Sequence, residues 1–153
     1  MKGFTVKLFL KPRCVCERSC AKKNRILVVD DDADLVRSIA TVLAAKGYEV
    51  STAKNGTEAM VAVNHALPDL IVLDVMMDSD TEGFTVAHKI KDNPATQAVP
   101  IILLSGFTDH LASNQEAFES VFSRDWPDAK FMKKPVTMNE LGTAVAAMLA
   151  EKR

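Results

Sequence analysis

Three segments of the chain are almost uninterrupted runs of apolar residues, and each of them ends in a polar side chain. The runs cover residues 26–31, 70–74 and 101–105. Runs of this length without alternation are typical of strands that are covered on both faces, as in a parallel sheet. A fourth segment, residues 131–135, has a shorter apolar run that is likewise followed by polar residues. The pattern therefore predicts several strands that each carry a polar side chain at the carboxyl end.

Segments with helical character separate the predicted strands. In residues 34–46 apolar positions recur every three or four residues, and Gly47 follows as a stop signal. Asn55 can cap a second helix with Glu58 reaching back, and residues 137–140 have the pattern of a capping box at the start of the last helix. The other predicted elements are strands over 48–53 and 129–132 and helices over about 84–92 and 111–122.

This order gives five strands that alternate with five helices. Parallel neighbours need a right-handed crossover, which a helix supplies, so the pattern predicts an α/β fold with a parallel sheet wrapped on both faces. Ligands of such sheets sit beyond the carboxyl ends of the strands. The polar residues that close the apolar runs are therefore expected to meet at one edge.

Composition and charge divide the chain into two parts. With 153 residues and average apolar and charged fractions, one globular domain is expected, over residues 25–153. Residues 1–24 carry seven Lys or Arg and a single Glu, a net charge of +6, which leaves −7 for the rest because the whole chain is −1. We expect a basic extension, disordered or the product of a start codon placed too early, in front of an acidic domain.

All three cysteines lie in this extension, at Cys14, Cys16 and Cys20. Their spacing is similar to that of a metal or Fe–S tract, but three thiolates are one short of a closed four-ligand site, so the metal site is the less favoured alternative. The domain itself has no thiol with which to form a disulfide. No apolar run approaches the roughly 20 residues of a membrane span, and no export signal is evident, so a cytoplasmic protein is expected.

The polar strand ends together suit phosphoryl transfer to a carboxylate. Asp30 or Asp31, with Asp74 and a backbone carbonyl such as that of Met76, can hold Mg²⁺, which prefers oxygen ligands. The Asp74 carboxylate can then attack phosphorus. Lys134 can hold a phosphate oxygen. The hydroxyl of Ser105 can donate a hydrogen bond to the phosphoryl group after transfer.

At these positions the chain resembles the response-regulator receiver domain of two-component signalling, over about residues 25–151. The matching segments are Val28-Val29-Asp30-Asp31, Val72-Leu73-Asp74, Leu104-Ser105-Gly106 and Lys134-Pro135. The resemblance implies a flavodoxin-like sheet of order 2-1-3-4-5 with five helices. It also implies the following roles: Asp74 as phosphoacceptor, Asp30 and Asp31 as the acidic metal pair, Ser105 as switch hydroxyl, Lys134 as phosphate-binding lysine and Phe131 as switch aromatic.

The same resemblance implies partners. A sensor histidine kinase or phosphotransfer protein would phosphorylate Asp74. The surface formed by the fourth helix, fifth strand and fifth helix would bind a downstream protein. Because no further segment follows the last predicted helix, we expect a stand-alone, chemotaxis-type regulator without direct DNA or membrane binding. It would be no enzyme beyond assisting its own phosphorylation and dephosphorylation.

Two features depart from the pattern of the family. Asp78 stands where a proline usually follows the paired methionines, and residues 106–128 form a longer segment than usual. The aromatic residues of that segment, Phe107, Phe118, Phe122 and Trp126, are expected to form a rebuilt docking surface or a lid over it.

Two other functions compete with the signalling switch. A haloacid-dehalogenase-type phosphatase also uses Asp and Mg²⁺, but it needs Asp-x-Asp-x-Thr after the first strand, and this chain has Asp34 at the Thr position. Its nucleophile would also lie on the first strand, which leaves Asp74 without a role. The other alternative is a receiver-like scaffold that takes no phosphate; the complete set of acids, hydroxyl and lysine speaks against it.

Overall fold

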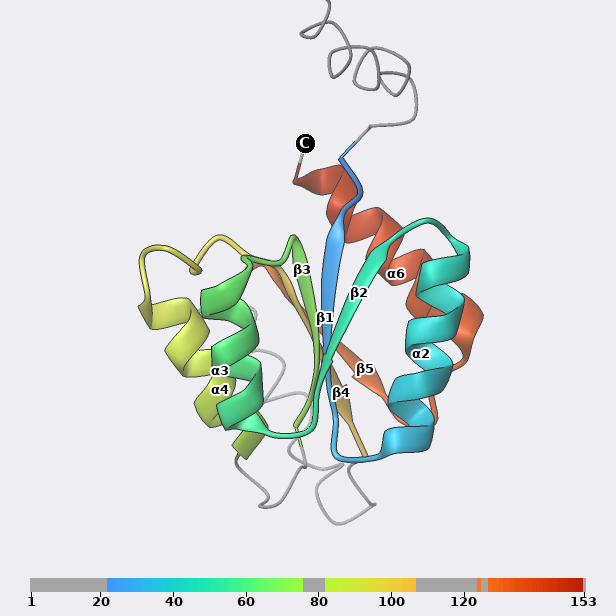
Figure 1. Ribbon diagram of the computed structural model, residues 1–153, viewed down its shortest axis with the longest axis horizontal. Coiled ribbons are helices and arrows are strands. Elements are labelled where there is room, and N and C mark those ends of the chain that lie inside the picture. The colour runs from blue at the N-terminus through green and yellow to red at the C-terminus, as the bar shows by residue number, and fades with distance from the viewer. Residues whose placement is uncertain (1–21, 76–81, 107–123, 125–126, 153) are drawn as a thin grey trace, which may run out of the picture.

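The computed structural model describes residues 22–75, 82–106, 124 and 127–152, and within them five strands form one parallel sheet. The strands are β1 (Arg25–Val29), β2 (Glu49–Ala53), β3 (Leu70–Asp74), β4 (Ile101–Ser105) and β5 (Ala129–Lys133). Their order is β2-β1-β3-β4-β5, with every neighbouring pair parallel (Figure 1). The predicted fold class and strand order are therefore confirmed.

Helices cover both faces of the sheet. They are α2 (Ala33–Ala45), α3 (Gly56–His65), α4 (Glu82–Asp92) and α6 (Met138–Glu151). Figure 1 shows α2 and α6 on one face and α3 and α4 on the other. Five helices were predicted; the one expected around residues 111–122 lies outside the described residues.

The central strands have apolar side chains on both faces, which explains their unbroken apolar runs. Every residue of β3 and β4 is buried. Successive residues alternate between two hydrophobic clusters: Ile71 packs with residues of α3 and α4, whereas Val72 packs with residues of α2 and α6. Burial on both sides holds the carboxyl ends of these strands at fixed positions.

Polar caps fix where the first two helices begin. The Asp32 carboxylate accepts a hydrogen bond from the N–H of Asp34 at 3.0 Å and caps α2, which begins at Ala33, one residue before the predicted start. The Asn55 side chain accepts from the N–H of Glu58 at 2.8 Å. Glu58 reaches back to the N–H of Lys54, the residue before the cap, at 2.9 Å.

The stop after α2 and the start of α6 also follow the predicted signals. Gly47 has a φ of 96°, a backbone region that favours glycine, and the chain turns there toward β2. At α6, Thr137 and Glu140 form the predicted capping box, with each side chain accepting from the other residue's N–H, at 3.2 Å and 3.1 Å.

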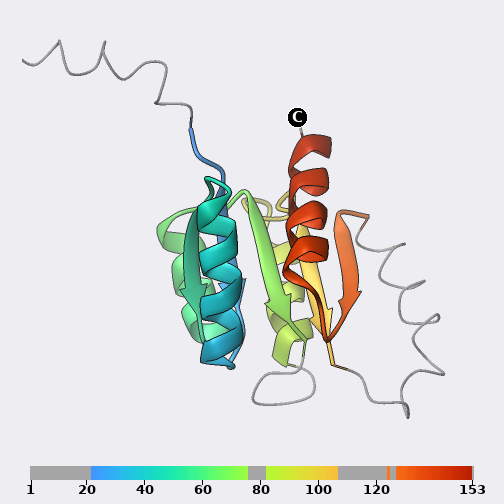
Figure 2. The same cartoon turned by 90° about the vertical axis from the view of Figure 1, so that its right-hand side faces the viewer.

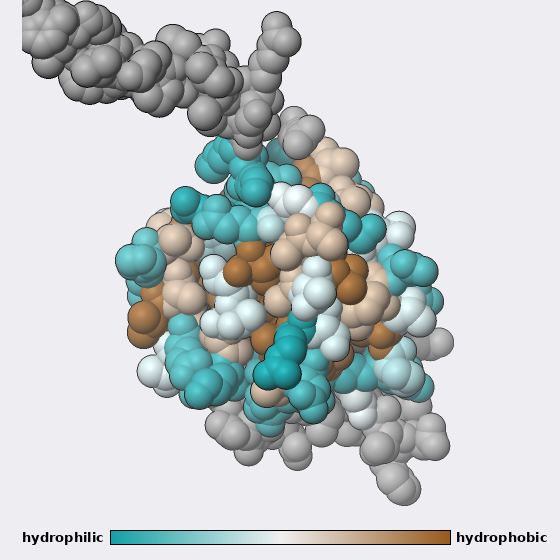
Figure 3. Space-filling model, turned by 45° about the vertical axis from the view of Figure 1, so that its right-hand side comes forward, coloured by the Kyte–Doolittle hydropathy of each residue, from teal (hydrophilic) through white to brown (hydrophobic). Residues whose placement is uncertain are grey.

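The outer surface described by the structure is mixed in polarity. On the face shown in Figure 3 the strongly apolar residues appear as separate patches between polar ones. Among the described residues, the large hydrophobic side chains with high exposure are Val61 and Leu67. No helix in the described part of the chain has the length and apolar character to cross a bilayer.

Candidate functional site

The polar residues predicted to close the strands meet at one edge of the sheet. Asp30 follows β1, Asp74 ends β3, Ser105 ends β4 and Lys134 follows β5. Because the strands are parallel, all of these ends point to the same edge, which is the lower one in Figure 2. The N–H of Lys134 donates to the carbonyl of Ser105 at 2.7 Å, so the last two positions are joined through the backbone.

Three carboxylates form a tight group at this edge. Asp30, Asp31 and Asp74 each place an oxygen so that the three oxygens lie within 4.8 Å of one another. Asp30 and Asp74 are each only 2% exposed, whereas Asp31 is exposed. Carboxylates at this spacing repel one another strongly where water screens them poorly, so the group favours a bound cation.

Lys134 supplies one positive charge to this group. Its Nζ lies 2.9 Å from Oδ2 of Asp30 and 3.3 Å from Oδ2 of Asp74. Burial of the ammonium lowers the pKa of Lys134, but the hydrogen bond and charge of Asp30 together with those of Asp74 outweigh it, so the pKa is raised. The lysine therefore stays charged at neutral pH and balances part of the negative charge.

The two neighbouring acids, Asp30 and Asp31, are placed differently. Oδ1 of Asp30 accepts from the N–H of Asp32 at 2.9 Å, and its Oδ2 accepts from Lys134. Both oxygens of Asp30 are therefore engaged within the protein. Asp31 is exposed, so among the three acids its side chain is the one that faces solvent.

The donor set fits a hard divalent ion. Three carboxylates against one lysine leave a net charge of −2, and all three offer oxygen, which Mg²⁺ prefers. Magnesium is typically held by one or two carboxylates and several waters, so an exposed Asp31 beside a buried Asp74 suits it.

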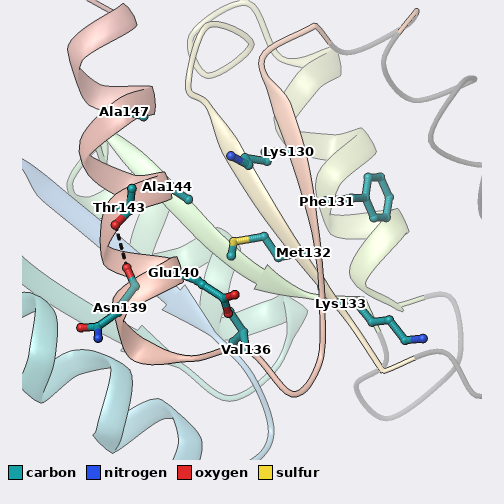
Figure 4. Close-up of a pocket in the computed structure, with 10 residues that line it drawn as sticks. All are labelled: Lys130, Phe131, Met132, Lys133, Val136, Asn139, Glu140, Thr143, Ala144 and Ala147. Carbon is teal, nitrogen blue, oxygen red and sulfur yellow. Dashed lines mark hydrogen bonds between the residues drawn. The ribbon is translucent and has the colours of Figure 1, made fainter.

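Ser105 and Phe131 lie on the neighbouring strands. Ser105 is buried, at 4% exposure. Phe131 pairs with Leu103 in the sheet and packs, half-buried, against the cluster beneath α3 and α4. Figure 4 shows Phe131 and Met132 on opposite faces of β5, with Met132 on the side of α6.

Two hollows adjoin these residues. A cavity of about 560 Å³ opens beside Asp30 and Asp31, and Arg37 of α2 and Lys54 after β2 contribute to its wall. No sequence pattern pointed to these two cations. A second hollow, of about 580 Å³, lies between β5 and α6, and Figure 4 shows the side chains around it.

Several of the residues named in the sequence analysis are ones that the structure does not describe. The following lie outside the described residues: Met76, Asp78, Phe107, Phe118, Phe122, Trp126, Cys14, Cys16 and Cys20. The Met76 carbonyl as a metal ligand, the aromatic docking surface and the roles of the basic extension therefore stay predictions.

Comparison with known proteins identifies similar sequences. Residues 26–146 match the model of the response regulator receiver domain. The response regulator PleD of Caulobacter vibrioides is 41% identical over 112 residues, which are 73% of this chain and 23% of PleD. The probable transcriptional regulator ycf27 of Porphyra purpurea is 33% identical over 128 residues, 84% of this chain and 48% of that protein. The chain thus spans half or less of these relatives.

Solved structures with the same architecture are also similar in sequence. A putative response regulator from Chloroflexus aurantiacus aligns with a TM-score of 0.69 at 30% identity, covering 84% of this chain and 99% of that one. A CheY-like receiver domain protein from Methanospirillum hungatei aligns with a TM-score of 0.71 at 27% identity, covering 85% and 96%. The similarity includes nearly the full length of both neighbours.

Proposed function

This chain belongs to the response-regulator receiver-domain family of two-component signalling, and on that premise we propose that it accepts a phosphoryl group on Asp74 and thereby switches a protein-binding surface. One observation carries the proposal. The buried Asp74 carboxylate lies 3.3 Å from the Lys134 ammonium and within 4.8 Å of the carboxylates of Asp30 and Asp31. This geometry supports Asp74 as the acceptor, Lys134 as the cation that would bind a phosphate oxygen, and Asp30 and Asp31 as the acid pair that would help to hold Mg²⁺.

The proposed donor is the phosphohistidine of a sensor kinase or phosphotransfer protein. An oxygen of Asp74 attacks phosphorus, a P–O bond forms, and the P–N bond breaks with its electron pair left on the imidazole, which takes a proton from water. The product is an acyl phosphate. Lys134 is close enough to move from its carboxylate partners to a phosphate oxygen as the group arrives.

Asp31 and Asp74 would hold Mg²⁺ directly, with the Met76 carbonyl as the third protein ligand. Asp30 would contribute indirectly, by holding Lys134 and the N–H of Asp32 in place, since both of its oxygens already accept hydrogen bonds from these groups. Bound Mg²⁺ would screen the charge of the incoming phosphoryl group. Asp30 and Asp31 would contribute by keeping Mg²⁺ beside the Asp74 carboxylate.

We propose that phosphorylation changes the conformation first of Ser105 and then of β5. The Ser105 hydroxyl would turn to donate a hydrogen bond to the phosphoryl group once it is attached to Asp74. Phe131, whose ring has no hydroxyl to keep hydrated, would then take a more inward rotamer. These changes would alter the shape of the surface made by β5 and α6.

The proposed output is docking to another protein. The groove between β5 and α6 is lined by apolar residues such as Met132 and Val136 together with charged residues such as Lys130 and Glu140, a mixture that suits a protein partner. Relatives such as the DNA-binding response regulator MtrA of Mycobacterium tuberculosis are about twice as long as the matched part, 51% of MtrA. Only the receiver portion is shared, so direct DNA binding is no part of this proposal.

Intact-mass measurement tests the function against its competitors. The protein and Asp74→Asn are each incubated with Mg²⁺ and a small acyl-phosphate donor. A gain of one phosphate by the unmutated protein alone supports the switch. In a parallel incubation with phosphomonoesters, repeated release of phosphate by each protein molecule would indicate the phosphatase. Absence of any gain in either protein would indicate the scaffold.

A further inference from the structure

Gly83, the second residue of α4, lies directly against the backbone that carries Asp74. It is buried, and its N–H donates to the carbonyl of Val75 at 3.3 Å. A Cβ placed on Gly83 would lie 2.5 Å from Val75 Cα and 2.8 Å from Val75 O, and it would also collide with the carbonyl oxygen of Asp74. All three obstacles are backbone atoms, so no side-chain rotation can relieve them.

The backbone on the other side of this contact is held by the sheet. Asp74 pairs with Leu104 in the β3–β4 ladder, and the N–H of Val75 donates to the carbonyl of Leu104 at 2.9 Å. A side chain at Gly83 therefore has two outcomes: α4 moves away from β3, or the peptide between Asp74 and Val75 shifts. Either outcome changes the backbone on one side of the segment 76–81.

Three other described glycines show that this restriction is local. A Cβ at Gly106 would meet only the Lys134 side chain, at 3.9 Å. At Gly142 of α6 the obstacle is Cε of Lys46 at 2.8 Å, the far part of a flexible side chain. Gly47 has open space around it, but its φ of 96° strains any residue with a side chain.

We propose that Gly83 is a positioning residue for phosphoryl transfer to Asp74. The missing side chain lets the first turn of α4 close on the Asp74–Val75 peptide, and this contact fixes the acceptor carboxylate relative to Lys134 and the acid pair. The inference rests on the proposed function of Asp74. It assigns Gly83 no contact with the phosphoryl group.

The test compares three glycine-to-alanine variants of the full chain. Gly83→Ala should lower the maximal rate of phosphate gain from an acyl-phosphate donor at saturating Mg²⁺ by about 10- to 100-fold, because small misplacements of reacting groups have effects of that size. Gly47→Ala controls for lost stability, since it should lower Tm by about 2–4 °C without touching the site. Gly142→Ala controls for the substitution itself in a buried helix position.

Rates are measured well below the Tm of every variant. The proposal holds if Gly83→Ala is slow while both control variants keep the rate of the unmutated protein. It is overturned if Gly83→Ala is no slower than Gly47→Ala. If the unmutated protein gains no phosphate, the proposed function fails instead, and the two failures are thereby distinguished.

A second measurement covers the case in which Gly83→Ala does not fold. In the unmutated protein, Mg²⁺ is titrated while backbone amide resonances are followed by NMR. The Gly83 amide should shift with the same midpoint as that of Val75, whereas the Gly142 amide should stay in place. A Gly83 amide that does not respond to Mg²⁺ while Val75 does would overturn the coupling.

Discussion

The two edges of the sheet both carry lysine–aspartate pairs, but they bury them to different degrees. At the carboxyl edge Lys134 lies 2.9 Å from Asp30 and 3.3 Å from Asp74, whose side chains are 1% and 3% exposed. At the amino edge Lys152 lies 4.0 Å from Asp69, and these side chains are 39% and 23% exposed. The same residue types therefore form a buried cluster at one edge and a loose surface pair at the other.

This difference indicates which charges serve a function. Exposed pairs such as Lys152–Asp69 contribute about 0–1 kcal/mol and are common on any surface. Burying carboxylates costs free energy that one lysine offsets only partly, so a cluster of three acids is a poor way to gain stability. The carboxyl edge is better explained by ligand binding and chemistry, as active sites often hold such clusters.

Replacing Lys134 with Ala should have the largest effect on stability. It removes the ammonium from two almost fully buried carboxylates, which should lower the free energy of unfolding by about 2–4 kcal/mol, toward the lower end of the range for a buried pair because Lys134 is itself partly exposed. Saturating Mg²⁺ should restore part of the loss. Urea denaturation with and without Mg²⁺ measures both quantities.

Lys152→Ala is the matched control for this prediction. It removes a lysine from the exposed pair with Asp69 and should change the free energy of unfolding by less than about 1 kcal/mol. Its response to Mg²⁺ should equal that of the unmutated protein. Equal losses from Lys134→Ala and Lys152→Ala would contradict the distinction between the two edges.

Stabilisation by Mg²⁺ should depend on Asp31. A ligand present at about 100 times its Kd raises the free energy of unfolding by about 2.7 kcal/mol when it binds only the folded state. At the same Mg²⁺ concentration Asp31→Asn should keep less than about 1 kcal/mol of this gain, because the accessible carboxylate is lost.

Asp34→Asn provides the comparison for Asp31→Asn. Asp34 is an exposed acid in the first turn of α2, outside the carboxylate group, and its loss removes the same charge close by. It should leave the Mg²⁺ response almost unchanged. If thermal melts show the same loss of Mg²⁺ stabilisation for both variants, Asp31 is no specific ligand.

The smallest effect is expected at Glu140, an acid at the carboxyl edge that is fully exposed. Hydrogen bonds from the N–H and hydroxyl of Thr137 hold the pKa of Glu140 below its ordinary value of 4.5. Its contribution to stability is therefore complete above pH 4.5 and is lost as the pH falls through the lowered value. Glu140→Gln should show a shallower loss of stability on acidification.

Denaturation midpoints of Glu140→Gln between about pH 6 and pH 3 check this expectation. Glu151→Gln, at the exposed far end of α6, serves as the control. Parallel pH curves for the unmutated protein and Glu140→Gln would show that the capping box contributes nothing that depends on charge.

The sequence was sufficient to predict the fold and the meeting of the polar residues. Apolar runs such as 70–74 marked strands covered on both faces, and parallel pairing forces their ends to one edge. That geometry brought Asp30, Asp74 and Lys134 together from positions far apart in the chain. Helix starts at Asn55 and Thr137 were recognisable because capping is local.

Properties that depend on three-dimensional packing were not predictable in this way. Asp30 and Asp31 are chemically identical neighbours, and only the fold buries one and exposes the other. The start of α4 was expected near residue 84, but the helix begins at Glu82, where Gly83 packs against Val75. A close approach of two backbones leaves no periodic signal in a sequence.

The most direct test of the account is to locate the phosphoryl group chemically. After incubation with Mg²⁺ and an acyl-phosphate donor, borohydride reduces an aspartyl phosphate to homoserine, and peptide mass spectrometry identifies the converted residue. We predict homoserine at position 74 alone, and none in Asp74→Asn. Conversion at Asp30 or Asp31 instead, or no conversion at any aspartate, would contradict the assignment of Asp74 as the acceptor.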